Sequence, residues 1–588
     1  MNRVSKPRLA RAGAAGYDST VTIKPALTFL ALALAFPCFA QSPSVSSASP
    51  AAAAPGRATE ITFAGANLAG ATALWTSFGA KAELVPPAGT NAPDASKVTF
   101  RLTLPATQPV GIGAVRVATT NGVSGLVPFL VDDLPSIADN GTNKAVTNAQ
   151  ALTLPVAVDG ACEELSYDFF KFTAKKGDRI AVDCVARRLG SALDPVVRVF
   201  DAKGRELAWS DDDPSAGRDS RALFEIPAAG AYFIEVRDIE YRGGAAFRYR
   251  LRVGSFPLVE FPFPFAAKAG DAGSFSLVGK GLETAKPLAL LAPKSAFAGR
   301  VPVNAKLPRG AATGFGGVLV TGFNEVNEVE PNDTNTLAQK LALPCAVNGR
   351  FARPRDRDWF EFTVAKGERL LIASRTRTLG SPCDCYMELF KPDGTRLAAT
   401  RPTAVEEAAI TNTFTEAGTY RLRVEEVNRL GGTNLAYRIE LAPAPAFALS
   451  VDTDKFEAAA GGSFSLKVDC ARAGHDGPVK LAFAEPSPGF TIENDIIAAK
   501  ATNTTMKVTL PAGLAPGRLV HLRLRGAAKV GEREESAAVG TMPALRKVFA
   551  DTVHSTLMIP PELDGLIAVG VKPAFPAKPV EPKSPSAK

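Results

Sequence analysis

One forty-residue stretch occurs twice in the chain, and this duplication constrains the fold more than any other feature of the sequence. Residues 168–207 read "DFFKFTAKKGDRIAVDCVARRLGSALDPVVRVFDAKGREL", and residues 358–397 read "DWFEFTVAKGERLLIASRTRTLGSPCDCYMELFKPDGTRL". The two stretches align without a gap, and 15 of their 40 positions are identical. Matching segments on both sides extend the unit to about 115 residues, which is far too long for a solenoid repeat. The chain therefore contains two copies of one domain.

Each copy has the pattern of short strands joined by turns. "FFKFTA" and "WFEFTV" alternate apolar and polar residues, and Gly204 and Gly394 supply the turn chemistry of hairpins. Strand signals recur at a spacing of about ten residues, as in β-sandwiches. A chain of 588 residues also exceeds the size of a single hydrophobic core, which stops growing near ~250–300 residues. We expect an all-β protein made of tandem β-sandwiches.

The second copy carries the pattern "E-x-E-P-N-D…G…D-x-D-W-F-x-F…KG", followed by "G-x-Y-x-x-x-V". This pattern resembles the bacterial pre-peptidase C-terminal (PPC) domain, and the match covers residues 133–254 and 325–442. The resemblance implies compact jelly-roll-like sandwiches of the kind appended to secreted proteases and other exported proteins. It also implies similarity to the collagen-binding domains of clostridial collagenases.

The regions around the two copies are also β in character. Residues 56–132 and the shorter 255–324 resemble immunoglobulin-like TIG domains, and residues 443–545 resemble another immunoglobulin-like sandwich. The order of modules is similar to that of exported PPC proteins of the planctomycete type. We expect a linker at 41–55, and a C-terminal extension with a Pro/Lys-rich disordered tail at 546–588.

The N-terminus has the features of an export signal. Basic residues precede the apolar run "PALTFLALALAFPCFA", which ends at Ala40 and is short for a membrane span. Cys38 and Ala40 occupy the −3 and −1 positions for cleavage before Gln41. Residues 1–40 are therefore expected to be a signal peptide, with an uncleaved anchor as the alternative. No membrane span is expected after cleavage, and the mature chain is expected to be secreted, periplasmic or at the cell surface.

Charge and motifs exclude several classes of function. The net charge of +8 falls to +4 without the leader, which holds five Lys or Arg and one Asp. The remaining charges are mixed in sign, so a nucleic-acid partner is not expected. None of the three histidines lies in an HExxH motif, and the sequence has no GxSxG elbow or phosphate-binding loop. We expect a non-enzymatic protein.

Six cysteines remain in the mature chain, and export permits them to form disulfides. Cys162 with Cys184 is a possible pair, with free buried thiols as the alternative. Cys345 with Cys383 or Cys385 is a second candidate. The spacings do not fit a zinc site.

An acidic segment opens the second copy. "NEVEPNDTNT" places Glu328, Glu330, Asn332 and Asp333 within six residues, and Pro331 restrains the chain among them. Carboxylate and amide oxygens are the ligands that calcium prefers. Asp356 and Asp358 stand at the start of a later strand and complete a candidate set. The PPC resemblance implies the same, because collagenase-type relatives bind calcium with an acidic N-terminal segment and a later Asp pair. The alternative is a solvated linker without coupling to Asp358.

The first copy lacks most of these acids. Gly141 stands at the position of Glu330, Lys144 at that of Asp333 and Ser166 at that of Asp356, whereas Asp168 is retained. A lysine is unfavourable in a calcium cage, so calcium is expected in the second copy only. The first copy also carries "SDDDPSAGRDS", for which a separate cation loop and an exposed hairpin loop are both open.

These features predict an exported, non-catalytic binding or scaffold protein with a calcium-stabilised second PPC domain. Its expected partner is an extracellular or periplasmic protein or polysaccharide. Two alternatives remain: a peptidase-associated protein or noncatalytic subunit of a secreted protease, and a glycan-binding surface protein.

Overall fold

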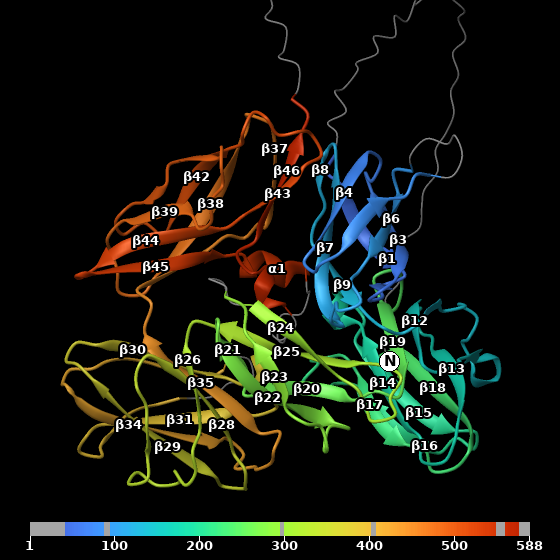
Figure 1. Ribbon diagram of the computed structural model, residues 1–588, viewed down its shortest axis with the longest axis horizontal. Coiled ribbons are helices and arrows are strands. Elements are labelled where there is room, and N and C mark those ends of the chain that lie inside the picture. Colours follow the sequence, from blue (N-terminus) through green and yellow to red (C-terminus); the bar gives the residue numbers. More distant parts are fainter. Residues whose placement is uncertain (1–40, 88–93, 295–298, 401–406, 549–558, 575–588) are drawn as a thin grey trace, which may run out of the picture. The chain divides into compact units, whose positions relative to one another are not determined.

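The computed structural model describes residues 41–87, 94–294, 299–400, 407–548 and 559–574. The described chain is nearly all β, and its strands form a series of paired sheets (Figure 1). The expected fold class, tandem β-sandwiches, is confirmed. The expected signal peptide at 1–40 lies outside the described residues.

The first copy of the duplicated unit, here called the first twin, is a sandwich of two five-stranded sheets. Side chains that alternate along its strands, such as Phe170 and Phe172, are buried in the core between the sheets. One sheet has the order β10 (Ser136–Ala138), β12 (Val156–Ala161), β19 (Arg248–Gly254), β14 (Arg179–Val185), β17 (Arg221–Glu225). The other has the order β11 (Gln150–Ala151), β13 (Asp168–Ala174), β18 (Gly230–Asp238), β15 (Pro195–Asp201), β16 (Glu206–Ser210). Short 3-10 turns lie at Val146–Asn148 and Arg187–Leu189.

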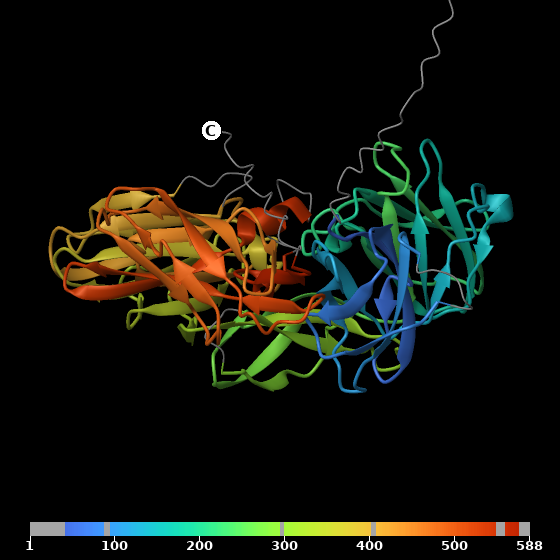
Figure 2. The same ribbon diagram turned by 90° about the horizontal axis from the view of Figure 1, so that it is seen from above.

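The second copy, the second twin, repeats this topology strand for strand, and Phe360 and Phe362 take the corresponding places in its core. Its first sheet has the order β26 (Asn324–Asn327), β28 (Cys345–Arg350), β35 (Ala436–Pro443), β30 (Arg369–Arg375), β33 (Ala409–Thr413). Its second has the order β27 (Gln339–Lys340), β29 (Arg357–Val364), β34 (Gly418–Glu426), β31 (Cys385–Phe390), β32 (Arg396–Ala399). A 3-10 turn lies at Arg377–Leu379. The twins are coloured teal to green and yellow to orange in Figures 1 and 2.

The N-terminal module begins earlier than the sequence predicts. Its sheets have the orders β1 (Ser44–Ser49), β3 (Ala58–Ala66), β6 (Lys97–Thr103), β5 (Lys81–Leu84) and β2 (Ala52–Ala53), β9 (Val127–Val131), β7 (Gly111–Thr119), β4 (Ala71–Thr76), with β8 (Gly122–Val123) beside β7. The expected linker at 41–55 is wrong, because β1 pairs with β3 and β2 pairs with β9. The sequence "SVSSAS" of β1 gives little apolar alternation because an edge strand is held by backbone hydrogen bonds.

The module at 255–324 is smaller, with two three-stranded sheets. These have the orders β20 (Leu258–Phe263), β22 (Ala272–Lys280), β23 (Leu288–Leu291) and β21 (Ala266–Lys268), β25 (Gly314–Thr321), β24 (Gly299–Ala305). This size agrees with the expectation of a short sandwich.

The C-terminal module extends past the expected boundary at residue 545. Its larger sheet has the order β40 (Thr491–Glu493), β42 (Asn503–Thr509), β38 (Ser463–Arg472), β36 (Phe447–Ser450), β45 (Arg533–Gly540), β44 (Leu524–Val530), β39 (Val479–Phe483), β41 (Ile496–Ile497). Its smaller sheet is β37 (Lys455–Ala459), β46 (Ile567–Lys572), β43 (Leu519–Leu522). The helix α1 (Met542–Val548) and a 3-10 turn at Pro561–Leu563 precede β46.

The strand β46 corrects the expected C-terminal extension. It lies beside β37 and β43, with which it pairs (Figure 1). Its residues Ile567, Val569 and Val571 are buried in the core of the module. The sequence did not predict this strand, because the apolar run is short and a proline-rich segment follows it. The expected disordered tail from residue 575 lies outside the described residues.

The cysteines of the described chain are free, buried thiols. Cys162 follows β12 and Cys184 lies on β14, and β19 runs between these two strands. Two strands separated by a third are about 9–10 Å apart, whereas a disulfide joins Cα atoms within about 7 Å. The possible disulfide between Cys162 and Cys184 is therefore not formed in this fold.

Candidate metal centre

The acidic segment of the second twin is tied into the sandwich at both ends. It follows β26, and the Glu328 N–H continues the ladder to the Asn348 carbonyl at 2.9 Å. Four residues later, the Asn332 carbonyl accepts the Trp359 N–H at 2.9 Å, at the start of β29. The segment therefore has a fixed course over the end of the sandwich that also holds Asp358.

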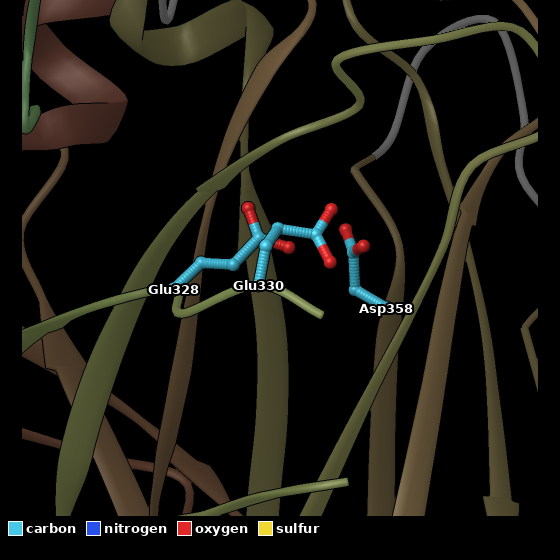
Figure 3. A group of neighbouring side chains, drawn as sticks. All are labelled: Glu328, Glu330 and Asp358. Carbon is cyan, nitrogen blue, oxygen red and sulfur yellow. The ribbon is translucent and has the colours of Figure 1, made fainter. Parts of the chain in front are cut away.

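The predicted acids come together in two groups that share Glu330. Carboxylate oxygens of Glu328, Glu330 and Asp358 lie within 4.8 Å of one another, as do those of Glu330, Asp333 and Asp356. Figure 3 shows Glu328 and Glu330 on one segment with their carboxyl groups beside that of Asp358. The segment therefore lies beside Asp358, as the calcium prediction requires, and calcium binding itself stays a prediction.

Three side-chain oxygens at the centre are buried and accept no hydrogen bond. They belong to Asn332, Asp356 and Asp358, which are at most 2% exposed. Buried polar atoms in folded proteins nearly always have a partner, so each unpaired oxygen requires an explanation. Oxygen atoms of this kind are also the donors that a hard cation such as calcium prefers.

The other oxygens of these side chains are held in place. Asp358 Oδ2 accepts from the Tyr437 hydroxyl at 2.6 Å, and Asp356 Oδ2 accepts from the Ala352 N–H at 2.8 Å. Glu328 accepts from the Arg350 N–H at 2.8 Å and from Asn332 Nδ2 at 3.1 Å. Hydrogen bonds within the protein thus orient these carboxylates.

Burial and mutual repulsion disfavour the charged forms of two acids in the first group, Asp358 and Glu328. Burial raises the pKa of Asp358 to about 10, and the neighbouring Glu328 carboxylate adds to the rise. Burial also raises the pKa of Glu328. Both shifts mean that the charged forms are unfavourable at this place without a cation.

The second group already has a positive neighbour. The Arg353 guanidinium is hydrogen-bonded to Asp333, and its Nε lies 3.5 Å from Asp356 Oδ1. Arg353 is largely exposed, and its charge also acts on Glu330, the residue that both groups share.

The sequence did not reveal Tyr437, which joins the two halves of the centre. Its buried hydroxyl lies 2.6 Å from Asp358 and 3.3 Å from Glu328. A Cβ atom on Gly349 would lie 2.3 Å from the tyrosine ring and hydroxyl, so glycine is required where the tyrosine crosses β28. The sequence did contain one signal for Tyr437: the pair of Gly349 and Tyr437 is repeated in the first twin as Gly160 and Tyr249.

The corresponding place in the first twin contains an ammonium group. Lys144 Nζ lies 2.6 Å from Asp168 Oδ1 and 3.8 Å from Glu163 Oε1. The carboxylate groups that could hold a metal ion in the described chain lie in the second twin alone.

Two acids of the loop "SDDDPSAGRDS", Asp213 and Asp219, are buried in ion pairs instead of lying on an exposed hairpin. Asp219 is fully buried, pairs with Arg188 at 2.6 Å and caps the 3-10 turn at Arg187–Leu189 through two backbone N–H groups. Asp213 pairs with buried Arg221 at 2.7 Å. These carboxylates are satisfied by the protein itself.

The comparisons with known proteins agree with the sandwich of the first twin. Residues 166–238 match the model of the bacterial pre-peptidase C-terminal domain, so this part of the chain is a PPC domain, a non-catalytic module. An 86-residue stretch is 43% identical to a probable subtilase-type serine protease of Deinococcus radiodurans, and covers 13% of this chain and 12% of that protease. The chain therefore matches only a small part of its curated relative.

Two solved structures match parts of the chain at low identity. The pre-peptidase C-terminal domain of a Bacillus anthracis collagenase is 16% identical, with a TM-score of 0.15, and the match covers 18% of this chain and 93% of that one. A Clostridium perfringens M60 catalytic domain with two CBM51 domains is 8% identical, with a TM-score of 0.13, over 68% of this chain and 43% of that one.

Among the helices of the described residues, none has the length and hydropathy needed to cross a bilayer.

Proposed function

We propose that this chain is an exported, non-catalytic binding or scaffold protein whose second twin is a PPC domain stabilised by calcium. The unpaired buried oxygens of Asn332, Asp356 and Asp358 carry the metal proposal. The strand order shared by the twins supports the assignment of the second as a PPC domain.

Calcium fits the donor set better than a transition metal. The candidate ligands are carboxylate and amide oxygens, without histidine or cysteine in either group. Glu328, Glu330 and Asp358 would hold the ion, since their carboxylate oxygens lie within 4.8 Å of one another. Asn332 would add its amide oxygen, and Asp333 and Asp356 would join after Arg353 moves aside.

The ion would stabilise the second twin by joining its N-terminal segment to β29. In the described fold, hydrogen bonds and Tyr437 make that connection. A ligand that binds only the folded state at about 100 times its Kd stabilises by about 2.7 kcal/mol. Calcium at extracellular concentration would thus protect the N-terminal segment of the second twin, near Glu330, against unfolding and against proteases.

Differential scanning calorimetry of the full chain in calcium and in EDTA tests this proposal. One transition is expected to move to higher temperature in calcium, and Glu330→Gln with Asp358→Asn is expected to abolish the shift. The matched control is Asp393→Asn, an exposed acid in a turn of the same twin. Identical melts of the unaltered chain in calcium and EDTA would refute calcium stabilisation.

Export and the scaffold role are supported by the leader sequence and by the module order. A cleaved N-terminus at Gln41 in protein recovered from the periplasm or medium is expected. One observation favours a second candidate, a noncatalytic partner of a secreted protease: the relative that matches over 86 residues is a probable subtilase-type protease. A change in the activity of a co-secreted protease on adding the purified chain would support that candidate.

A further inference from the structure

The loops that open the two twins follow the same path. The Asn143 carbonyl accepts the Phe169 N–H at 2.8 Å, as the Asn332 carbonyl accepts the Trp359 N–H in the second twin. In each loop a glutamine, Gln150 or Gln339, accepts a backbone N–H and donates to a backbone carbonyl. Positions in the two loops can therefore be compared one to one.

The aspartate at the centre is also held in the same way. Tyr249 donates to Asp168 Oδ2 at 2.8 Å, and Tyr437 donates to Asp358 Oδ2 at 2.6 Å. Both aspartates are buried, at 1% and 0% exposure. The second oxygen of each aspartate therefore faces the same place in its twin.

That second oxygen has different partners in the two twins. Asp358 Oδ1 accepts no hydrogen bond, whereas Asp168 Oδ1 accepts from Lys144 Nζ at 2.6 Å. Lys144 stands in the sequence where the second twin has Asp333. The first twin thus has a lysine in place of the acid Asp333, and the ammonium group of this lysine is hydrogen-bonded to Asp168.

The other substitutions agree with this exchange of charge. Gly141 and Ser166 stand where the second twin has Glu330 and Asp356, so, with Lys144 at the position of Asp333, the first twin lacks three of the second twin's five acids. Of the two acids left at this place, Asp168 is buried and pairs with Lys144, whereas Asp139, at the position of Glu328, is half-buried.

We infer that Lys144 is a tethered replacement for the metal ion, so that the first twin folds with its own cation and responds to no added metal. The metal response of the chain is then confined to the second twin. This inference rests on the proposed calcium site for the contrast between the twins, but the role of Lys144 is tested independently of calcium. The simpler explanation is that Lys144 and Asp168 form an ordinary surface ion pair. Such a pair contributes little to stability, so its loss would have little effect.

Hydrogen–deuterium exchange of the full chain, read by peptide, separates the twins. Lys144→Met leaves Asp168 charged, buried and without its cation, so exchange over residues 139–172 is expected to rise at least tenfold in calcium and EDTA alike. Lys176→Met, at an exposed lysine of the same twin, is expected to exchange as the unaltered chain does.

The double variant Lys144→Met with Asp168→Asn removes the charge together with its partner. Its exchange is expected to return toward that of the unaltered chain, because no uncompensated buried charge remains. This comparison between the double variant and the unaltered chain remains informative even if Lys144→Met alone is largely unfolded. Native-like exchange of Lys144→Met, or failure of Asp168→Asn to restore protection, would overturn the inference.

Calcium itself provides the remaining test. Calcium-dependent protection of residues 139–172 in the unaltered chain would also overturn the inference, because the ammonium would not be the resident cation. A lack of calcium response over residues 328–358 would instead refute the proposed function. The two failures therefore appear in different peptides.

Discussion

The hydroxyl of Tyr437 donates a hydrogen bond to Asp358 at 2.6 Å, and this contact fixes the carboxylate that faces the acidic segment. The tyrosine reaches it from β35 by crossing Gly349 on the neighbouring strand β28. The strand that carries Asp358, β29, belongs to the other sheet. One buried side chain therefore connects both sheets of the sandwich to the candidate metal centre.

Tyr437→Phe is expected to weaken calcium binding by about 10–100-fold, the usual effect of losing a group that orients a metal ligand. Isothermal titration of the full chain with calcium measures this change. Tyr249→Phe, the matched change in the first twin, is expected to leave the calcium titration unaltered. Equal affinities of Tyr437→Phe and the unaltered chain would show that the hydroxyl does not orient Asp358 for binding.

The ion pair between Asp213 and Arg221 predicts a loss of stability in acid. Burial acts to raise the pKa of Asp213, but the charge and hydrogen bond of Arg221 outweigh it and lower the pKa to about 2. A carboxyl group with a depressed pKa in the folded state stabilises above its unfolded pKa, near 3.9, and the contribution is lost as the pH falls toward 2. The shift corresponds to about 2–3 kcal/mol.

Asp213→Asn is therefore expected to be less stable than the unaltered chain at pH 7, and the difference is expected to narrow between pH 4 and pH 2. Urea unfolding of the first twin, followed by hydrogen exchange of its peptides, measures the difference at each pH. A difference that stays constant over this range would contradict the assignment of the depressed pKa to Asp213.

Val569→Asp tests the unexpected strand β46. The side chain is fully buried between partners on β37 and β43, and an unpaired carboxylate at such a position is expected to cost several kcal/mol. Ile496→Asp changes an exposed apolar residue of the same module and is expected to alter stability by about 0.5 kcal/mol or less. Calorimetry that finds the two variants equally stable would place residues 567–572 outside the folded module.

Much of the fold could be predicted because the information is local or repeated. Alternation in "FFKFTA" and "WFEFTV" identifies β13 and β29, and the duplication shows that two copies of one sandwich exist. The strands β1 and β46 could not be predicted in this way. An edge strand is held by backbone hydrogen bonds with little apolar pattern, and a six-residue strand among prolines gives a weak signal.

For the candidate site, the sequence by itself determined the inventory: the acids Glu328, Glu330, Asp333, Asp356 and Asp358, and their partial loss in the first copy. Which of them meet was decided by the tertiary structure, because strand pairing brings Asp358 beside a segment almost thirty residues earlier in the chain. The roles of Tyr437 and Lys144 likewise became visible only in the tertiary structure. A hydroxyl or an ammonium group is informative when its distance to a buried carboxylate is known, and that distance depends on contacts remote in sequence.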